Sequence, residues 1–323
     1  MQEVSKDIFY KLIADFEWIP YTQTLAYNLS IVDESTLHWY IDDVNNPTVG
    51  CVGYERYKMG MKMLCVAGEC RKEMNSINRK RYAAFYQDLH DTGFDIYEVN
   101  ISTPYSVDAE IALRTTGWLR PVGLFSTTLS KIVPTKQPLA LDKSWKHNLK
   151  KAHEASLIFK VQEQIDVPCI QDFLAHHKEL QKYKGFSEDI TESGLLALSK
   201  DTHFKIAMVT DAEHQTLAGC VFYARPNASS TIYSFSTSEG REHGAAYLLR
   251  EGIVQYLAQQ GINELDLGRL SPAIHKKNNI FLFKDGIGGE YVQYLGEWQW
   301  CKSRWMPLAL YFMKKYIWKR VQV

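Results

Sequence analysis

The hydrophobic and polar positions of the chain follow two periods, most clearly towards the C-terminal end. Residues 231–236 (TIYSFS) are mostly β-branched or aromatic, which predicts a strand. From residue 245 to 257 every fourth residue is apolar, which predicts a helix that ends at Gly261. Residues 265–268 (LDLG) alternate as a second strand. Strand, glycine-bearing turn, helix and strand together predict a βαβ unit.

The same order of elements occurs in the first half of the chain. The patterns there predict helices over residues 3–16, 75–92 and 106–116, and strands over 37–41, 48–57, 61–66, 94–101 and 123–129. Because the two halves share this order but no repeated residues, we expect a duplication of structure rather than of sequence. Near the C-terminal end, residues 281–289 (FLFKDGIGG) lead into an alternating run, so we expect Lys284 at the start of a strand.

A proline-bracketed segment divides the chain. Pro134–Pro138 is polar between its two prolines, which predicts a linker. We therefore expect one domain over residues 1–135 and a second over 136–323. The patterns of the second half further predict helices over residues 142–155 and 166–182 and strands over 205–209 and 217–224.

Length and composition limit the classes of protein that fit. A chain of 323 residues, 46% hydrophobic and 23% charged, is typical of a folded protein of about two domains. Lys plus Arg equals Asp plus Glu, so the composition gives no sign of DNA binding. The six cysteines form no Cys-x-x-Cys pair, so we expect reduced thiols and no metal site. The charged N-terminus and the absence of a long apolar run predict a cytoplasmic protein.

The turn before the C-terminal helix has the chemistry of a phosphate site. Unpaired N–H groups at a helix N-terminus lie at the positive end of the helix dipole. Gly244 and Ala246 leave room for an anion and Arg241 adds a charge, although an ordinary strand-to-helix turn explains the same residues. In the basic helix over 142–155, Lys150 shares a side with other lysines, which gives either a solvated face or a phosphate-facing surface.

Several segments resemble the FemABX family. LDLGRLSP (265–272) followed by FLFKDGIGGEYVQYLGEW (281–298) is similar to the family's C-terminal signature. Ser144–Val161 (SWKHNLKKAHEASLIFKV) is similar to the segment that begins its second half, and Pro20–Gln23 to its Pro-Phe-x-Gln motif. The resemblance implies an α/β fold of two tandem GNAT-like (GCN5-type acyltransferase) domains, with mixed sheets flanked by helices. No heptad run is long enough for the coiled-coil arm of some members.

The resemblance also implies a site. The lysine that matches Lys284 is assigned in the family to acyl transfer, and a lysine at this position can offset negative charge on a carbonyl oxygen or phosphate. Phe283, beside it, is a candidate substrate contact. Arg269, at a strand end, can line an anionic ligand. Tyr183 and Lys184 match an element beside the family's precursor pocket.

The remaining candidates are open to two readings. Tyr223 and Tyr233, on neighbouring predicted strands, either stack on a base or sugar or pack in the core. The family's aspartate before a proline is missing from residues 100–104 (NISTP), so Asp108 is the candidate catalytic carboxylate, unless it only belongs to the following helix. Since no nucleophile motif is present, we expect direct aminolysis.

Three functions stay open. The first is transfer of an aminoacyl group from aminoacyl-tRNA, bound by its acceptor end, to an amine of a nucleotide- or lipid-linked peptidoglycan precursor. The second is a CoA-dependent N-acyltransferase that uses acetyl-CoA or another acyl-CoA, because Arg241-x-x-Gly244-x-Ala246 resembles the pyrophosphate loop of GNAT proteins. The third is a non-catalytic module that binds a glycan or a nucleotide. We prefer the first, with no tightly bound cofactor, because the whole-chain pattern and the Lys284 segment favour it.

The C-terminal tail is aromatic and basic. Residues 308–320 predict an amphipathic helix, which either packs on the domain or lies on an anionic membrane. Peripheral contact with the inner face of the membrane would suit a lipid-linked precursor.

Overall fold

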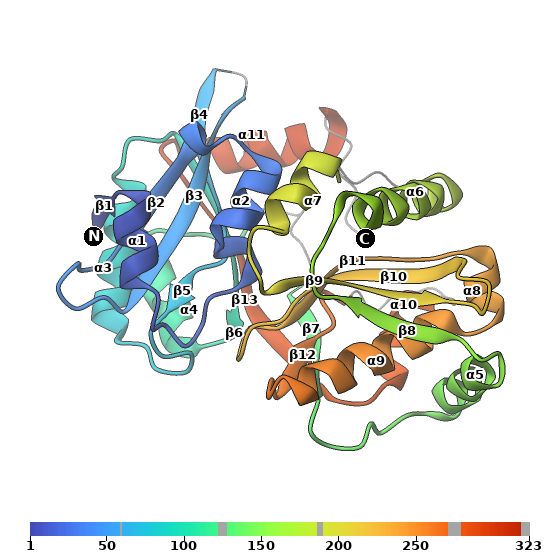
Figure 1. Ribbon diagram of the computed structural model, residues 1–323. Helices are drawn as coiled ribbons and strands as arrows, with labels where there is room; N and C mark the ends of the chain where they lie inside the picture. The colour runs from blue at the N-terminus through green and yellow to red at the C-terminus, as the bar shows by residue number, and fades with distance from the viewer. Residues whose placement is uncertain (59, 122–127, 186–189, 271–278, 318–323) are drawn as a thin grey trace. The chain divides into compact units, whose positions relative to one another are not determined.

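The computed structural model describes residues 1–58, 60–121, 128–185, 190–270 and 279–317 (Figure 1). Contacts divide the chain into two compact units: unit 1 contains Met1–Thr24, Val32–Leu129 and Val292–Val323, and unit 2 contains Leu25–Ile31 and Ser130–Tyr291. This division differs from the single cut predicted at residue 135, because the chain enters unit 2 early and returns to unit 1 at Val292. Pro134 ends a strand and does not open a linker.

Unit 1 is built on a mixed sheet in the order β1-β2-β3-β4-β6-β13, with β5 paired to β3. The strands are β1 (Gln2–Val4), β2 (Leu37–Ile41), β3 (Val49–Lys58), β4 (Met61–Ala67), β5 (Cys70–Arg71), β6 (Ile96–Pro104) and β13 (Glu290–Cys301), which enters this unit at Val292. β4 and β6 are parallel, with Met63 opposite Ile96, and the other pairs are antiparallel.

The helical segments of unit 1 cover this sheet. They are α1 (Lys6–Leu12), η1 (Tyr21–Gln23), η2 (Glu34–Thr36), α3 (Arg79–His90), α4 (Val107–Thr115), α11 (Met306–Phe312) and the π-helical turn η3 (Met313–Ile317). The α3 helix connects the parallel strands β4 and β6, and the Asn78 side chain caps it by accepting a hydrogen bond from the Arg81 N–H. Its apolar face, with Tyr82, Phe85 and Leu89 at helical spacing, belongs to the core of this unit.

Unit 2 is built on a second mixed sheet in the order β7-β12-β11-β10-β9-β8. The strands are β7 (Leu129–Pro134), β8 (Ile158–Gln162), β9 (Phe204–Thr210), β10 (Thr216–Tyr223), β11 (Ser230–Ser236) and β12 (Glu264–Asp266). β11 and β12 are parallel and pair only at Ser230 and Asp266, whereas the other pairs are antiparallel.

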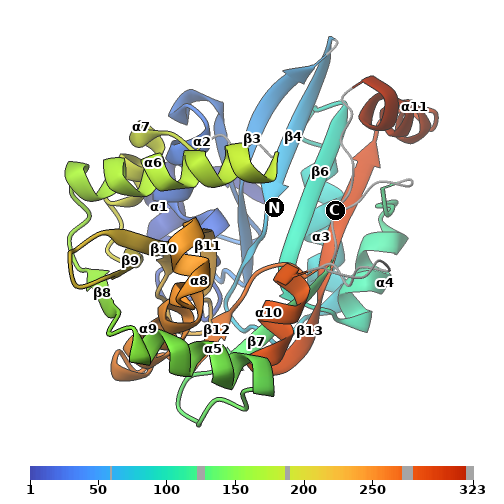
Figure 2. The same ribbon diagram turned by 90° about the vertical axis from the view of Figure 1, so that its right-hand side faces the viewer.

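Helices cover both faces of the unit 2 sheet. They are α2 (Leu25–Ile31), α5 (Lys143–Glu154), α6 (Val167–Lys184), α7 (Glu192–Leu198), α8 (Ser238–Glu242), α9 (Ala245–Gln259) and α10 (Asn279–Gly286). The α9 helix packs on β8, β9 and β10 and against α5, while α6 lies on the opposite face against β11 (Figures 1 and 2). The core between α9 and the sheet includes Trp145, Phe222, Leu249 and Ile253.

The two units repeat one arrangement, as predicted. Each places a helix between two parallel neighbouring strands: α3 between β4 and β6, and α9 between β11 and β12. In the described part of the chain the longest helix is α6, with 18 residues, so this part contains no coiled-coil arm. None of the helices described is long and apolar enough to cross a bilayer.

Candidate functional site

Lys284 lies in the last turn of α10, not at the start of a strand, which corrects the prediction from sequence. Phe281 and Phe283 alternate as they would in a strand, and the prediction of a strand was based on this spacing. The helical turn is held by tertiary contacts: the Phe283 carbonyl accepts a hydrogen bond of 2.6 Å from Trp145 Nε1, and the two rings stack 5.0 Å apart. Phe283, predicted to contact substrate, therefore anchors α10 to α5.

The residue after Lys284 is anchored as well. Lys131 on β7, whose side chain is 4% exposed, donates from Nζ to the carbonyl of Asp285 at 2.8 Å and to its Oδ1 at 2.9 Å. Hydrogen bonds from Tyr291 and Lys131 lower the pKa of Asp285. With Phe283 and Asp285 both fixed, the backbone of Lys284 has a defined position.

The ammonium group of Lys284 reaches the end of β12. Its Nζ donates to the carbonyl oxygens of Gly268, at 3.3 Å, and Arg269, at 3.1 Å. Gly268 has a φ of +77°, a left-handed conformation that glycine adopts readily, and this turns the chain out of the sheet. Burial lowers the pKa of Lys284 to about 8, aided by the charge of Arg250 and opposed by Asp266. At neutral pH the group is still mostly a cation.

The edge of β11 beside Lys284 is open within the described chain. β11 continues to Ser236, but β12 pairs with it only at Ser230, so the rest of this edge has no strand partner among the described residues. A Cβ added at Gly268 would lie 3.6 Å from Lys284 Nζ and 3.7 Å from the carbonyl oxygen of Thr231 on β11. Lys284 therefore stands where β11 and β12 diverge.

Arg250, on α9, was not singled out from the sequence. The residue is 6% exposed, and its Nη1 lies 3.9 Å from Cys220 Sγ on β10. Its Nε is buried and has no hydrogen-bond partner among the described residues. A signal was available, because Arg250 interrupts the apolar stretch 247–257 (YLLREGIVQYL).

The predicted phosphate turn consists of two helices rather than one. The α8 and α9 helices are separated by Gly244, with a φ of +73°. A Cβ on Gly244 would lie 2.4 Å from the Asn148 carbonyl oxygen on α5, so packing against α5 already requires this glycine. Ala246 is half-buried in the first turn of α9, and the exposed Arg241 donates to the Ser236 carbonyl at 2.7 Å.

Two predicted residues do come together on this side of unit 2. The guanidinium of Arg241 lies 4.8 Å from the ring centroid of Tyr183, which is 72% exposed in the last turn of α6. Lys184 is the next residue and is also exposed. The structure thus joins a candidate from the phosphate turn to a candidate from the resemblance.

The two tyrosines on the sheet differ from each other. Tyr223 is 1% exposed and its ring packs 5.0 Å from that of Phe204, so a stacking role for Tyr223 is not met in this structure. Tyr233 is half-buried on β11, with its ring 6.3 Å from that of His177. Of the pair, Tyr233 alone keeps surface available.

Two further candidates lie in surface ion pairs. The Lys150 side chain on α5 is 75% exposed, and its Nζ is 3.5 Å from Glu154. Asp108 belongs to α4 of unit 1, has a side chain 56% exposed, and lies 3.6 Å from Arg79. Such pairs contribute little to stability, and neither contact points to a bound ligand.

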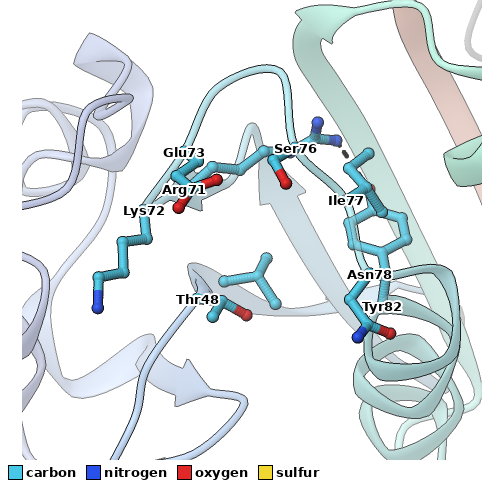
Figure 3. Close-up of a pocket in the computed structure, with 9 residues that line it drawn as sticks. Thr48, Arg71, Lys72, Glu73, Ser76, Ile77, Asn78 and Tyr82 are labelled. Atoms are coloured by element: carbon cyan, nitrogen blue, oxygen red, sulfur yellow. Dashed lines mark hydrogen bonds between the residues drawn. The ribbon is translucent and has the colours of Figure 1, made fainter.

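Unit 1 contains a small cavity of about 150 Å³ beside the N-terminus of α3 (Figure 3). It is lined by Thr48, Val49, Arg71, Lys72, Glu73, Ser76, Ile77, Asn78 and Tyr82. The Arg71 guanidinium is 2.5 Å from the fully buried Glu69, which also accepts hydrogen bonds from Tyr82 and Tyr86. The buried arginine of this cavity is already paired with Glu69, and no residue predicted from sequence as part of the site lines the cavity.

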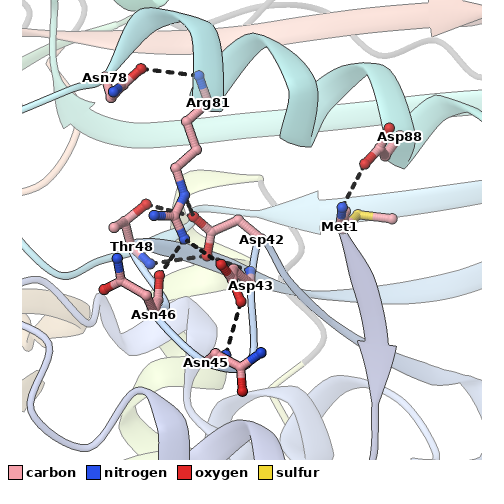
Figure 4. A network of polar contacts seen from close by, with 9 residues as sticks. All are labelled: Met1, Asp42, Asp43, Asn45, Asn46, Thr48, Asn78, Arg81 and Asp88. Carbon is pink, nitrogen blue, oxygen red and sulfur yellow. Dashed lines mark hydrogen bonds and ion pairs between the residues drawn. The ribbon is translucent and has the colours of Figure 1, made fainter.

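The wall of this cavity is tied to the sheet by a polar network (Figure 4). Arg81 Nε lies 2.6 Å from Asp42 Oδ2. The Asp42 side chain is 3% exposed, and its carboxylate also accepts a hydrogen bond from Thr48. The N-terminal ammonium of Met1 pairs with Asp88 on the same helix. These contacts fix α3 and are explained by structure alone.

Comparisons with known proteins found a family match in the second half of the chain and solved structures with a similar fold. Residues 189–315 match the FemAB family model. A solved structure titled "Crystal structure of FemX" is similar with a TM-score of 0.75, 11% identity, and coverage of 97% of this chain and 99% of that one. L-PGS from Bacillus licheniformis gives a TM-score of 0.66, 13% identity, and coverage of 99% of both chains. A search of curated proteins gave no significant match.

These matches confirm the predicted resemblance to FemABX proteins, and the structure has the predicted α/β fold with mixed sheets flanked by helices. At such identities the solved structures show the fold alone. The family match covers the segment that contains β11, α9, α10 and Lys284, and it supports a transferase of the FemABX kind.

Proposed function

We propose that this chain, which resembles FemABX proteins in sequence and fold, transfers an aminoacyl group from aminoacyl-tRNA to an amine of a peptidoglycan precursor. The observation that carries the proposal is Lys284, a half-buried cation fixed where β11 and β12 diverge. Its segment lies within the residues that match the FemAB family model.

The chemistry assigned to Lys284 follows from its charge and position. In direct aminolysis the acceptor nitrogen attacks the ester carbonyl carbon, a C–N bond forms, and the carbonyl oxygen becomes an oxyanion. A fixed ammonium beside that oxygen stabilises the tetrahedral intermediate. The bond between the acyl carbon and the ribose oxygen then breaks, and the proton lost by the amine passes through solvent or substrate to the ribose oxygen, which leaves as a hydroxyl. Lys284 keeps its proton throughout.

Arg241 and Tyr183 are assigned to binding. Both are exposed, they stack on each other, and they lie beside the turn that precedes α9. A planar cation over an aromatic ring offers a surface for a phosphate and a base. We assign this pair to the nucleotide part of a substrate, with Lys184 as a neighbouring charge.

A CoA-dependent N-acyltransferase is the second candidate, and the Arg241–Ala246 turn favours it. Packing of Gly244 against Asn148 gives that glycine another explanation, which weakens this reading. Both donors place a carbonyl beside Lys284, so the lysine does not distinguish them.

The experiment that tests the proposal compares donors directly. Purified protein is mixed in parallel with tRNA charged with radiolabelled amino acids and with radiolabelled acetyl-CoA, each with a nucleotide-linked peptidoglycan precursor as acceptor. We expect label to move from charged tRNA to the precursor. Transfer from acetyl-CoA alone would establish the second candidate, and binding without transfer from either donor would favour the non-catalytic module.

A further inference from the structure

Arg250 is a buried cation of unit 2 for which the described residues provide no anionic partner. Arg250 is 6% exposed, its Nε has no partner among the described residues, and its one polar contact there is Cys220 Sγ at 3.9 Å. A thiol at this distance is a weak acceptor, and taking a guanidinium out of water without a counter-charge costs several kcal/mol or more, on the order given for unpaired buried ions.

Neighbouring charges do not remove this cost. The second cation, Lys284, is close enough for Arg250 to lower its pKa, and the one carboxylate that acts on Lys284 is Asp266. Asp266 is itself engaged by the Gly268 N–H, at 2.8 Å, and by Ser130. Residues 271–278, outside the described part, contain no acidic residue. The carboxylate that acts on Lys284 is therefore already hydrogen-bonded, and no ion pair joins Arg250 to a carboxylate among the described residues.

Solvent comes close to this pair from the open edge of β11. Ser234 is exposed, and its hydroxyl donates to Cys220 Sγ at 3.2 Å, on the thiol that Arg250 contacts. Arg250 is thus linked through Cys220 to Ser234 on the edge of β11. Lys284 lies near the Thr231 carbonyl of the same strand and close enough to Arg250 for that guanidinium to lower its pKa. We expect a small group that enters at this edge of β11 to lie near both cations.

The position of Arg250 along α9 separates it from the phosphate turn. It lies six residues after Gly244, which at about 1.5 Å per residue is roughly 9 Å along the helix. Its guanidinium contacts Cys220 on β10 rather than a described residue of the turn, so an anion bound at the turn is not its expected partner. With the carbonyl of the donor held by Lys284, as proposed, the part of the donor nearest Arg250 would be the acyl side chain.

We infer that the acyl group taken by this site carries a carboxylate, which pairs with Arg250, so that the donor is an acidic aminoacyl group rather than a neutral or basic one. A guanidinium matches a carboxylate with two parallel hydrogen bonds, and the Nε–H is one of the donors available for them. The inference rests on the proposed function for the identity of the donor; the anion site itself does not.

The test uses two donors that differ in one group. One tRNA is charged with glutamate or with glutamine by an aminoacylating ribozyme, and competition binding and transfer are measured with the wild-type chain. We expect glutamyl-tRNA to be preferred at least tenfold over glutaminyl-tRNA. Equal use of the two donors, or a preference for glutamine, overturns the inference and leaves the proposed function standing.

Three variants test whether Arg250 causes the preference for glutamyl-tRNA over glutaminyl-tRNA. Arg250→Gln should abolish it, Arg250→Lys should keep part of it, and the matched control Arg225→Gln, at an arginine between β10 and β11, should leave the ratio unchanged. The measured quantity is the ratio of glutamyl-tRNA to glutaminyl-tRNA use by the same variant. A general loss of activity lowers the use of both donors and leaves this ratio unchanged. A preference that persists in Arg250→Gln assigns the carboxylate to another residue and overturns the inference.

A last arm separates this inference from the proposed function. Thermal unfolding is measured with glutarate, neutral glutaramide and inorganic phosphate, none of which requires tRNA. We expect glutarate, and not glutaramide, to raise the melting temperature of the wild type but not of Arg250→Gln. If no charged tRNA is used but glutarate acts through Arg250, the anion site stands and the proposed function fails. If phosphate acts through Arg250 and glutarate does not, the occupant is a phosphate and the acyl inference is wrong.

Discussion

The ammonium nitrogen of Lys284 lies 3.1 Å from the carbonyl oxygen of Arg269, the third residue after the end of β12. A residue on α10 thus contacts the turn after β12, fifteen residues earlier in the chain. The Lys284 ammonium has three N–H donors. Two of them are used by the carbonyl oxygens of Gly268 and Arg269, which favour the charged form, and one remains. That remaining donor is what the proposed chemistry uses.

Removing the charge of Lys284 should slow transfer without preventing binding. We expect Lys284→Met to lower kcat by about 10²–10³-fold, or about 3–4 kcal/mol of barrier, the range found when one oxyanion donor is deleted. Lys284→Arg, which keeps a cation, is the matched control and should lose less. Steady-state kinetics with a constant donor measure both, and a full rate in Lys284→Met would remove this residue from the mechanism.

The pH dependence of transfer should report the same group. Burial lowers the pKa of Lys284 to about 8, so the cation is lost as pH rises through that value. We expect kcat to fall above pH 8 in the wild type. In Lys284→Arg this limb should be absent, because a guanidinium stays charged over the accessible range. A rate that instead rises through pH 8 would mean that the neutral amine acts as a base.

Stability should depend on pH through Lys284 in a direction unusual for a lysine. The folded pKa of about 8 lies below the ordinary value of 10.5, so between these values the unfolded chain binds more protons and stability rises with pH. Below pH 8 the full penalty, on the order of 3 kcal/mol, is present, and above pH 10.5 it is absent.

Urea unfolding of the wild type and of Lys284→Met at pH 7 and pH 10 checks this penalty. The methionine variant lacks the titrating group, so its advantage over the wild type should shrink as pH rises. A difference in the free energy of unfolding that stays the same at both pH values would contradict the burial of the charge.

The anchor beneath α10 should matter for activity more than for folding. Trp145→Phe keeps an aromatic ring on Phe283 but removes the Nε1–H that the Phe283 carbonyl accepts. We expect a loss of about 1 kcal/mol in the free energy of unfolding and a larger proportional fall in kcat, because Lys284 follows Phe283 directly. Tyr247→Phe, which keeps the ring that packs on Trp145, is the control and should leave kcat unaffected.

The C-terminal tail should bind anionic membranes. Trp305, Leu308, Phe312 and Tyr316 are 79%, 44%, 49% and 61% exposed and follow three- and four-residue spacing, while Leu310 packs on the core of unit 1. An exposed aromatic face beside Lys315 suits insertion at a lipid headgroup boundary. Co-sedimentation with phosphatidylglycerol vesicles should fall in a Trp305→Ser/Phe312→Ser variant, and equal sedimentation with neutral vesicles would argue against this role.

Much of the fold could be predicted, because it rests on local periodicity. The strand at 37–41 and the helices near α3, α4 and α6 follow apolar spacing that the sequence displays directly. The expected strand over 123–129 falls almost entirely outside the described residues. The division into units could not be predicted, since it depends on which distant strands pair, and β13 returns to β6 near the end of the chain.

The candidate site could be proposed from the sequence only where a local motif marks it. Lys284 was found through the motif around it, but its helix was missed because the contact between Trp145 and Phe283, made by residues 138 positions apart, decides the local conformation. Arg250 was missed because the residues that bury it come from other segments of the chain, which the local sequence does not show. A basic residue on an apolar helix becomes informative only when burial and the absence of a described partner for its Nε are known.

A single-turnover measurement tests the central claim most directly. Excess wild-type protein is mixed rapidly with radiolabelled aminoacyl-tRNA and a nucleotide-linked peptidoglycan precursor, and labelled precursor is followed over time beside Lys284→Met. We expect labelled precursor to form in one exponential phase that Lys284→Met slows by about 10²-fold or more. Aminoacyl-tRNA that stays intact with the wild-type protein, or equal rates for the two proteins, would contradict acyl transfer at Lys284.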